Sequence, residues 1–203
     1  EQVPDVLQEQ IPLIEALLVG FGVAPVGVPD FEADDVIGTY ASTATSPVDV
    51  VTGDRDLFQL VDDQREVRVL YTARGISRIQ YVDAAFVQDK YGVEPGQYAD
   101  MATLRGDSSD GLPGVAGIGE KTAASLLRMY GDLRGVREAA QDPAAAMAPR
   151  VRASLLAASE YLDKAPAVVQ VARDLDVPPP PATLPQPDLA LLDAIAEEFG
   201  IGN

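Results

Sequence analysis

The chain has 203 residues, of which 47% are hydrophobic, and a formal net charge of −17 at pH 7. This length and apolar content suffice to bury a core in one domain with an appended subdomain. Cysteine and histidine are both absent, which excludes disulfides, zinc–thiolate sites, thiolate nucleophiles and imidazole bases. Any catalysis must therefore use carboxylates, hard metal ions, lysine, arginine, tyrosine or hydroxyl groups.

The negative charge is unevenly distributed along the chain. On its own, a net charge of −17 argues against a nucleic-acid partner. Residues 117–152, however, carry six basic and four acidic side chains, so this stretch is locally positive. A metal-binding protein can combine an acidic site with a mildly basic docking face, and nucleic acid therefore remains open as a partner.

The sequence contains no candidate for a membrane span. Its most apolar stretch, residues 11–29, is interrupted by Glu15 and by several prolines and glycines. We therefore expect no membrane association. Because no signal peptide precedes the first predicted helix, we expect a cytoplasmic protein, and the composition is compatible with a monomer.

Hydrophobic periodicity predicts a series of helices and short strands. Apolar residues at helical spacing predict helices over residues 4–18, 31–43, 57–61, 83–91, 95–104, 120–130, 132–140, 148–162 and 189–199. Apolar and alternating runs predict strands at residues 23–28, 48–52, 66–71, 76–81 and 168–171. We expect 48–52 to be a central parallel strand and 76–81 to pair with 66–71 as a hairpin. Prolines make residues 177–187 a stiff, extended connector.

The order of these elements predicts an α/β fold with a mostly parallel sheet flanked by helices, because strands and helices alternate through residue 71. The later helices form a helical subdomain. We therefore expect a core over residues 1–94 and a helical subdomain over residues 95–165. Residues 166–203 would supply a strand, the connector and a helix that packs back on the core.

Acidic side chains gather in three groups near the ends of predicted elements. The groups are Glu32, Asp34 and Asp35; Asp54 and Asp56; and Asp107 and Asp110. Acids in a first helical turn also suit the helix dipole, and an aspartate N-cap explains one residue of the second group. Three carboxylates within four positions nevertheless repel one another unless a cation neutralises them. Sites of open α/β sheets lie at the carboxyl ends of strands, where the second group falls, and hard divalent ions prefer such oxygen ligands.

A glycine-rich turn opens the helix predicted over residues 120–130. Gly117 and Gly119 permit positive φ and close backbone approach, and a helix N-terminus attracts anions. Lys121 lies in the first turn, where a cation is unfavourable against the dipole, so we expect it to have an anionic partner. The turn can hold a phosphate, although an ordinary glycine-rich helix start with a solvated lysine fits the same residues.

Three motifs together resemble the bacterial 5′-nuclease, or flap endonuclease, family. They are Glu-Ala-Asp-Asp at residues 32–35, Thr-Gly-Asp-Arg-Asp-Leu at 52–57, and Gly-Asp-Ser-Ser-Asp-Gly-Leu-Pro-Gly-Val-Ala-Gly-Ile-Gly-Glu-Lys-Thr-Ala at 106–123. This family includes the 5′–3′ exonuclease domain of DNA polymerase I and stand-alone relatives, which the tail at 197–203 resembles more. The resemblance implies a PIN-like α/β domain with a helix–three-turn–helix element over about residues 97–130.

The resemblance also implies a site and its ligands. Two Mg²⁺ or Mn²⁺ ions would be held, the first by Glu32, Asp34 and Asp35, with some of these bridging both ions, and the second by Asp54, Asp56, Asp107 and Asp110. The turn and helix start would bind duplex phosphates, with a K⁺ ion held by backbone carbonyls, through Gly117, Ile118, Gly119, Glu120, Lys121 and Thr122. The implied partner is DNA with a 5′ flap or 5′ end, which would place the protein at the nucleoid.

The family pattern also contains segments that do not occur in the printed sequence. It begins with a strand bearing a ligand aspartate, a second strand ending in another, and a basic arch that threads the 5′ end. None of these precedes Glu1. We therefore expect the chain to lack the first strand of the sheet, two ligands and the most basic segment of the family.

The sequence thus predicts a structure-specific 5′-nuclease of replication and repair, a 5′–3′ exonuclease or flap endonuclease that hydrolyses DNA phosphodiesters with two metal ions. A second hypothesis is a non-catalytic DNA-junction binder in which the carboxylates serve structurally. A PIN-type ribonuclease is a third, which the helix–three-turn–helix signature disfavours.

Overall fold

The structure is a computed structural model that describes residues 5–181, 183 and 185–200. Contacts between Cα atoms divide the chain into two compact units. We call residues 33–175 the central unit and the remainder, up to Glu32 and from Asp176, the terminal unit. Each unit is described by itself, and the three-part division expected from the sequence stays a prediction.

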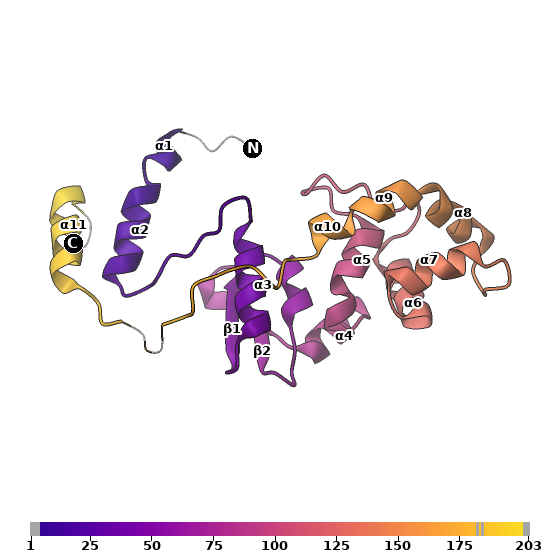
Figure 1. Ribbon diagram of the computed structural model, residues 1–203, viewed down its shortest axis with the longest axis horizontal. Helices are drawn as coiled ribbons and strands as arrows, with labels where there is room; N and C mark the ends of the chain where they lie inside the picture. Colours follow the sequence, from indigo (N-terminus) through magenta and orange to yellow (C-terminus); the bar gives the residue numbers. More distant parts are fainter. Residues whose placement is uncertain (1–4, 182, 184, 201–203) are drawn as a thin grey trace. The chain divides into compact units, whose positions relative to one another are not determined.

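Two helices pack side by side in the terminal unit (Figure 1). These are α2 (Ile11–Gly20) and α11 (Leu189–Phe199), and a short helix α1 (Asp5–Gln8) precedes them. A Cβ on Gly20 would lie 2.7 Å from a Leu192 methyl group, so the absence of a side chain at Gly20 permits this packing. The Asp188 N–H also donates to the Gly20 carbonyl at 2.8 Å.

Two expectations for the terminal unit need correction. The helix predicted over 4–18 is two helices, because Pro12 stands at the start of α2 and has no N–H with which to continue a preceding helix; residue 4 lies outside the described residues. The strand predicted at 23–28 is wrong. That stretch is irregular, and Val23 and Val26 are 48% and 36% exposed, so no sheet face buries them.

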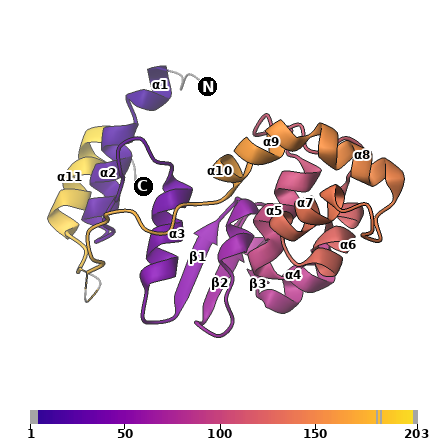
Figure 2. The ribbon, with the colours of Figure 1, turned by 45° about the vertical axis from the view of Figure 1, so that its right-hand side comes forward.

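The central unit contains a mixed sheet of three described strands, β1 (Val48–Thr52), β2 (Val67–Tyr71) and β3 (Gln80–Val82), in the order β1-β2-β3 (Figure 2). The β1 strand runs parallel to β2, from Val48 opposite Val67 to Thr52 opposite Tyr71. The β3 strand is antiparallel to β2. The α/β prediction is confirmed, and so is the antiparallel pairing that follows β2. The strand predicted at 76–81 was too long, since Ile76–Arg78 form a 3-10 helix and only Gln80–Val82 form the strand. The described sheet is mixed rather than mostly parallel, and β2 rather than β1 is its centre.

Helices form most of the rest of the central unit, and only some of them contact the sheet. They are α3 (Ala33–Thr43), α4 (Ala84–Tyr91), α5 (Tyr98–Arg105), α6 (Glu120–Tyr130), α7 (Leu133–Gln141), α8 (Pro149–Ala157), α9 (Ser159–Lys164) and α10 (Pro166–Val169), with short 3-10 helices η1 (Asp56–Leu60), η2 (Ile76–Arg78) and η3 (Pro95–Gln97). The strand predicted at 168–171 is wrong. Its first half belongs to α10, where the Val168 and Val169 N–H groups bond to the Ala165 carbonyl.

Phe58 is the centre of the core of the central unit. Its ring contacts Tyr71 at 5.1 Å, Tyr98 at 5.5 Å, and Phe86 and Tyr91 at 6.1 Å between centroids. The contacts with Tyr71, Phe86 and Tyr98 are edge-to-face, and such contacts add to the stabilisation from burial alone. The core therefore ties η1 to β2, α4 and α5, and it fixes the backbone that immediately follows the second acidic group.

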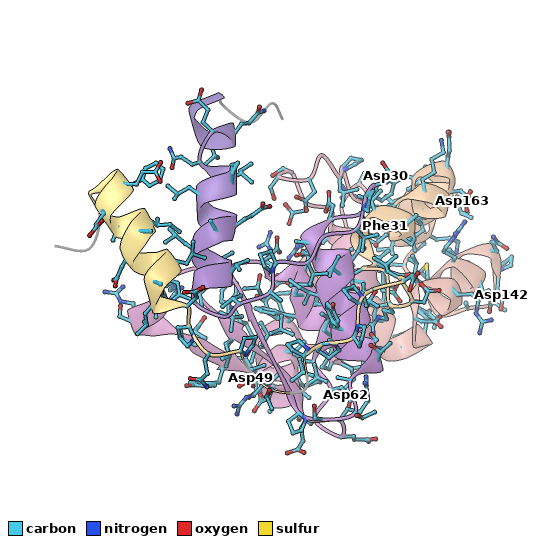
Figure 3. All side chains as sticks on the ribbon, turned by 60° about the vertical axis from the view of Figure 1, so that its left-hand side comes forward. Asp30, Phe31, Asp49, Asp62, Asp142 and Asp163 are labelled. Atoms are coloured by element: carbon cyan, nitrogen blue, oxygen red, sulfur yellow. The ribbon has the colours of Figure 1, made fainter. Side chains whose placement is uncertain are left out.

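Several aspartates of the central unit have local structural roles, and Figure 3 shows four of them. Asp49 forms an ion pair with Arg68 at 2.6 Å, and Asp163 pairs with Arg137. Asp62 and Asp142 accept hydrogen bonds from backbone N–H groups of their own turns, at 3.0 and 2.9 Å. These contacts account for the four carboxylates without any ligand.

Candidate metal centre

Two loops of the central unit bring four of the seven predicted carboxylates into electrostatic contact. Asp54 and Asp56 follow β1, whereas Asp107 and Asp110 follow α5. Burial, together with the charges of Asp54, Asp110 and Asp107, raises the pKa of Asp56 to about 6. Like charges disfavour ionisation only over short range, so these four side chains lie near one another, and we call them the carboxylate cluster.

The turn after β1 holds Asp56 in a fixed position. The Asp54 N–H donates to the Thr52 hydroxyl at 2.9 Å, and the Asp56 N–H donates to the Asp54 carboxylate at 2.8 Å. The Gln59 side-chain amide then donates to the Asp56 carbonyl at 2.9 Å. Asp54 therefore orders the turn and also contributes a charge to the cluster.

One oxygen of Asp56 is buried and has no hydrogen-bond partner among the described residues. Leaving a buried acceptor unsatisfied costs about 1–3 kcal/mol, and such groups are uncommon unless they bind an ion or a water molecule or have a functional role. A cation bound at Asp56 would satisfy this oxygen and relieve the repulsion among the neighbouring carboxylates. The donor set therefore fits a hard divalent ion.

Asp107 is already fully engaged by protein groups. One carboxylate oxygen accepts the Ser109 N–H at 3.0 Å and also the Ser109 hydroxyl. The other accepts the guanidinium groups of Arg55 and, at 3.3 Å, of Arg105. The Ser109 hydroxyl, assisted by Arg55, lowers the pKa of Asp107 to about 2, so this carboxylate stays ionised.

The two arginines and Ser109 are site residues that sequence reasoning missed. Arg55 stands between two candidate ligands, and Arg105 stands two residues before a third. A cation placed among acids was a signal for an ion pair. The actual partner of Arg55, however, lies 52 residues further on, and no local spacing reveals such a contact.

The first acidic group is not part of the carboxylate cluster described in the central unit. Glu32 belongs to the terminal unit, while Asp34 and Asp35 form the first turn of α3. Asp35 accepts the Ala172 N–H at 2.7 Å. Among the described residues no three carboxylates converge closely enough to hold a metal ion together, and cations and N–H groups already engage Asp107 and Asp35. The metal roles of all seven residues remain predictions.

The turn between α5 and α6 depends on two glycines that approach each other's backbone. Gly106 and Gly114 have φ values of 79° and 66°. A Cβ on Gly106 would lie 2.5 Å from the Gly114 nitrogen, and one on Gly114 would lie 2.4 Å from the Arg105 carbonyl oxygen. Neither position tolerates a side chain without displacement of the backbone. The buried residues Val115 and Ile118 anchor the turn in the core.

The start of α6 offers free donors and an uncommitted cation. Gly119 caps the helix with extended backbone, and the space around Gly117 and Gly119 is open. The first N–H groups of a helix have no partner within it. Lys121 is exposed, and it forms no ion pair with any residue of the described chain. This surface suits an anion, and the predicted phosphate-binding role of the turn stays a prediction.

Arg105 connects the two halves of the site. Its guanidinium group pairs with Asp107 at 3.3 Å and with Glu120, the first residue of α6, at 3.4 Å. Its side chain is only 16% exposed. The carboxylate cluster and the start of α6 are therefore linked by one partly buried cation.

Family descriptions match the chain almost from end to end. Residues 1–92 match "5'-3' exonuclease, N-terminal resolvase-like domain" and residues 93–189 match "5'-3' exonuclease, C-terminal SAM fold". A 5'-3' exonuclease of Streptomyces coelicolor is 55% identical over all of this chain and 68% of its own length. One of Mycobacterium tuberculosis is 50% identical over 87% of this chain and 58% of its length. The chain belongs to the 5′–3′ exonuclease family, and it spans about three-fifths to two-thirds of these relatives.

The family includes part of a larger replication enzyme. DNA polymerase I of Mycobacterium tuberculosis is 46% identical over 66% of this chain and 15% of its own length. The expected relationship to the polymerase domain is therefore confirmed. The tail at 197–203, predicted to resemble the stand-alone relatives, lies partly outside the described residues.

Solved structures share the fold at low sequence identity. A bacteriophage T5 D15 flap endonuclease, in a pseudo-enzyme-product complex with DNA and metal ions, matches 96% of this chain and 66% of its own, with a TM-score of 0.63 and 18% identity. The catalytic core of Rad2 in complex with a DNA substrate matches 98% and 66%, with a TM-score of 0.61 and 16% identity. The helices described in this chain include no membrane-span candidate.

Proposed function

We propose that this chain hydrolyses DNA phosphodiesters as a metal-dependent, structure-specific 5′-nuclease, acting on a 5′ end or 5′ flap. The observation that carries the proposal is the carboxylate cluster around the buried, unpartnered oxygen of Asp56, joined through Arg105 to the start of α6. Membership of the 5′–3′ exonuclease family supports it. Action on bacterial DNA would place the protein at the nucleoid, in the cytoplasm.

The carboxylates would hold two divalent ions, Mg²⁺ or Mn²⁺. We assign Asp54, Asp56, Asp107 and Asp110 to one ion, and Glu32, Asp34 and Asp35 to the other or to both. Such ions activate a water molecule and stabilise the leaving oxygen of a phosphodiester. The T5 flap endonuclease, which shares the fold, was solved with metal ions and DNA, and this supports both the cofactor and the substrate.

The chain's own residues would bind and orient the DNA. The free N–H groups of α6 and the ammonium group of Lys121 are suited to phosphates of the duplex, with a K⁺ ion shared by the Gly117–Gly119 turn and the DNA. Arg105 would keep this anchor at a constant position relative to Asp107. The hydrogen bonds of the turn after β1 would keep Asp54 and Asp56 facing the bound phosphate.

The proposal is tested with a 5′-flap DNA labelled at its 5′ end, incubated with the chain in Mn²⁺ and in EDTA. We expect cutting near the junction in Mn²⁺ only. Asp54→Asn should slow it roughly 100-fold or more, since even groups that merely support a metal ligand are worth 10- to 100-fold. Asp142→Asn, which alters only a surface turn, is the matched control. Equal cutting by wild type and Asp54→Asn would exclude the assigned site.

A non-catalytic DNA-junction binder is the second candidate, and the full engagement of Asp107 by Arg55, Arg105 and Ser109 favours it. In that case the carboxylates would be structural. Tight binding of the flap without cutting, in Mn²⁺ and at any pH, would establish this function. Preferential cutting of RNA would instead indicate the ribonuclease hypothesis.

A further inference from the structure

Arg55 occupies a position in which a metal ion and a guanidinium group compete for the same carboxylate. We propose that Arg55 is an exchangeable counter-ion of Asp107, which leaves when a divalent ion loads the cluster and then binds a phosphate of the DNA. The inference rests on the function proposed above and assigns it a further substrate-binding residue. Metal loading and DNA binding would thereby be coupled through one side chain.

Asp107 has no vacant acceptor position for an ion in the described arrangement. Ser109 donates twice to one oxygen, and Arg55 and Arg105 donate to the other. A carboxylate offers about four lone-pair sites. One of the present donors must therefore withdraw before Asp107 can bind a divalent ion. The ion and a guanidinium group are both positively charged and repel each other, so a guanidinium group is the donor that withdraws.

The two guanidinium groups differ in how firmly they are held. The Arg105 side chain is 16% exposed. Besides Asp107, it donates to the Gly106 carbonyl at 3.1 Å and pairs with Glu120. The Arg55 side chain is 43% exposed, and within the described part of the chain its one hydrogen bond is to Asp107. Withdrawal of Arg55 breaks a single partly solvated ion pair, whereas withdrawal of Arg105 breaks three interactions. Arg55 is the side chain that exchanges.

The backbone of Arg55 determines where the released group can go. Its neighbours Asp54 and Asp56 are joined by a hydrogen bond, and η1 follows with Leu57 and Phe58 in the core. The guanidinium group therefore swings from a fixed Cα at the rim of the cluster. Arginine's planar fork suits the bidentate recognition of a phosphate oxygen pair, and the substrate phosphate is the anion that approaches this rim.

The first measurement is the affinity of DNA-free protein for Mn²⁺, by calorimetry. Arg55→Gln removes the competitor, and we expect its Mn²⁺ binding to be roughly tenfold tighter than that of wild type. The matched control is Arg68→Gln, which removes another exposed arginine–aspartate pair outside the cluster and should leave the affinity unchanged. Arg55→Lys should give an intermediate affinity, and thermal unfolding in EDTA verifies that each variant is folded.

A general charge effect would also tighten metal binding, so the second measurement is affinity for flap DNA with and without metal. Ca²⁺ replaces Mn²⁺, and a gel verifies that the DNA stays intact. In EDTA, wild type and Arg55→Gln should bind DNA equally, since Arg55 is then paired with Asp107. In Ca²⁺, wild type should bind about threefold to tenfold more tightly than Arg55→Gln. An equal loss in both conditions, or none in either, would overturn the exchange.

A direct readout follows the guanidinium group itself. In NMR spectra of protein labelled with ¹⁵N-arginine, the Arg55 side-chain signal is assigned by its loss in Arg55→Lys. This signal should shift on titration with Mg²⁺, and the midpoint of the shift should equal the midpoint of metal binding. The Arg68 signal should stay in place. A stationary Arg55 signal at saturating Mg²⁺ would refute the proposal. These results are independent of cleavage, so an inactive wild type would count against the proposed nuclease and not against the exchange.

Discussion

The N–H of Ala172 donates a hydrogen bond to the Asp35 carboxylate at 2.7 Å, across 137 positions of sequence. Next to it, the Leu175 N–H donates to the Thr39 hydroxyl at 3.3 Å. The segment after α10 is thus bonded along α3, and it holds the first turn of α3 in place. Two candidate ligands, Asp34 and Asp35, lie on that turn, so this segment positions part of the predicted site.

Close packing at Gly38 is the first feature to test. A Cβ at this position would lie 2.6 Å from the Ala172 carbonyl oxygen, so Gly38→Ala must push the segment away from α3. We expect a loss of about 1–3 kcal/mol in the free energy of unfolding, measured by urea denaturation. Gly96→Ala is the control, since nothing lies within 4 Å of a Cβ there; a similar loss in both variants would contradict this explanation.

The raised pKa of Asp56 predicts that, in EDTA, the stability of the protein falls as the pH rises. Its pKa is raised to about 6 from 3.8, so the folded state holds more protons than the unfolded state between these values. The contribution of Asp56 to stability is therefore full below pH 4 and is lost as the pH rises to about 6, by about 1–2 kcal/mol after solvent screening. Urea midpoints across pH 4–7 measure it.

The variant Asp56→Asn separates this group from the others. In this variant the free energy of unfolding should no longer fall between pH 4 and 6. It should still decrease below pH 4, because the pKa of Asp107 is lowered in the folded state. Saturating Mn²⁺ should also remove the fall in wild type, because a bound cation stabilises the ionised carboxylate. A fall that persists in Asp56→Asn would mean that another group is responsible.

The crossing of Gly106 and Gly114 predicts a severe effect of a single methyl group. Gly114→Ala places a Cβ 2.4 Å from the Arg105 carbonyl oxygen at a φ of 66°, and it should lower the unfolding midpoint and abolish flap binding. Gly111→Ala has a similar φ of 70° but open space around it. It tests backbone strain alone, and we expect a loss of about 1 kcal/mol with binding preserved. Equal defects would mean that strain, not the close approach, limits the turn.

We expect replacement of Lys121 to change the salt dependence of DNA binding. Lys121→Ala removes one phosphate contact, so the slope of log K against log salt should decrease by about 0.9. Lys164→Ala is the matched control, because Lys164 is exposed but paired with Glu160. Fluorescence anisotropy from low to moderate salt gives both slopes, and an unchanged slope in Lys121→Ala would remove the phosphate assignment.

Local sequence patterns were enough to predict elements with clear end signals and a regular spacing of buried residues. The helix α6 was predicted with its observed bounds, 120–130, because glycines flank it and its buried face repeats at helical spacing. The apolar runs at 23–28 and 168–171 carried no such marks, and short apolar runs do not distinguish a strand from other structures. Tertiary packing decided both.

The candidate site shows the same division. Each acidic group lies within four consecutive residues, so its presence could be read from the sequence, and so could its position at the end of an element. The contacts that neutralise the groups join distant residues, as Arg55 and Asp107 do. Whether carboxylates from separate loops meet a metal ion, an arginine or a backbone N–H depends on the fold and not on their spacing.

In the proposed function, the partly buried guanidinium group of Arg105, shared between Asp107 and Glu120, would hold the start of α6 at a fixed distance from the carboxylates. A duplex bound by its phosphates at the start of α6 would then present the bond to be cut at a constant position. The number of nucleotides between the bound phosphates and that bond would be set by the protein. Flaps of different lengths should be cut at the same position relative to the junction, and loss of Arg105 should blur that position before it abolishes cutting.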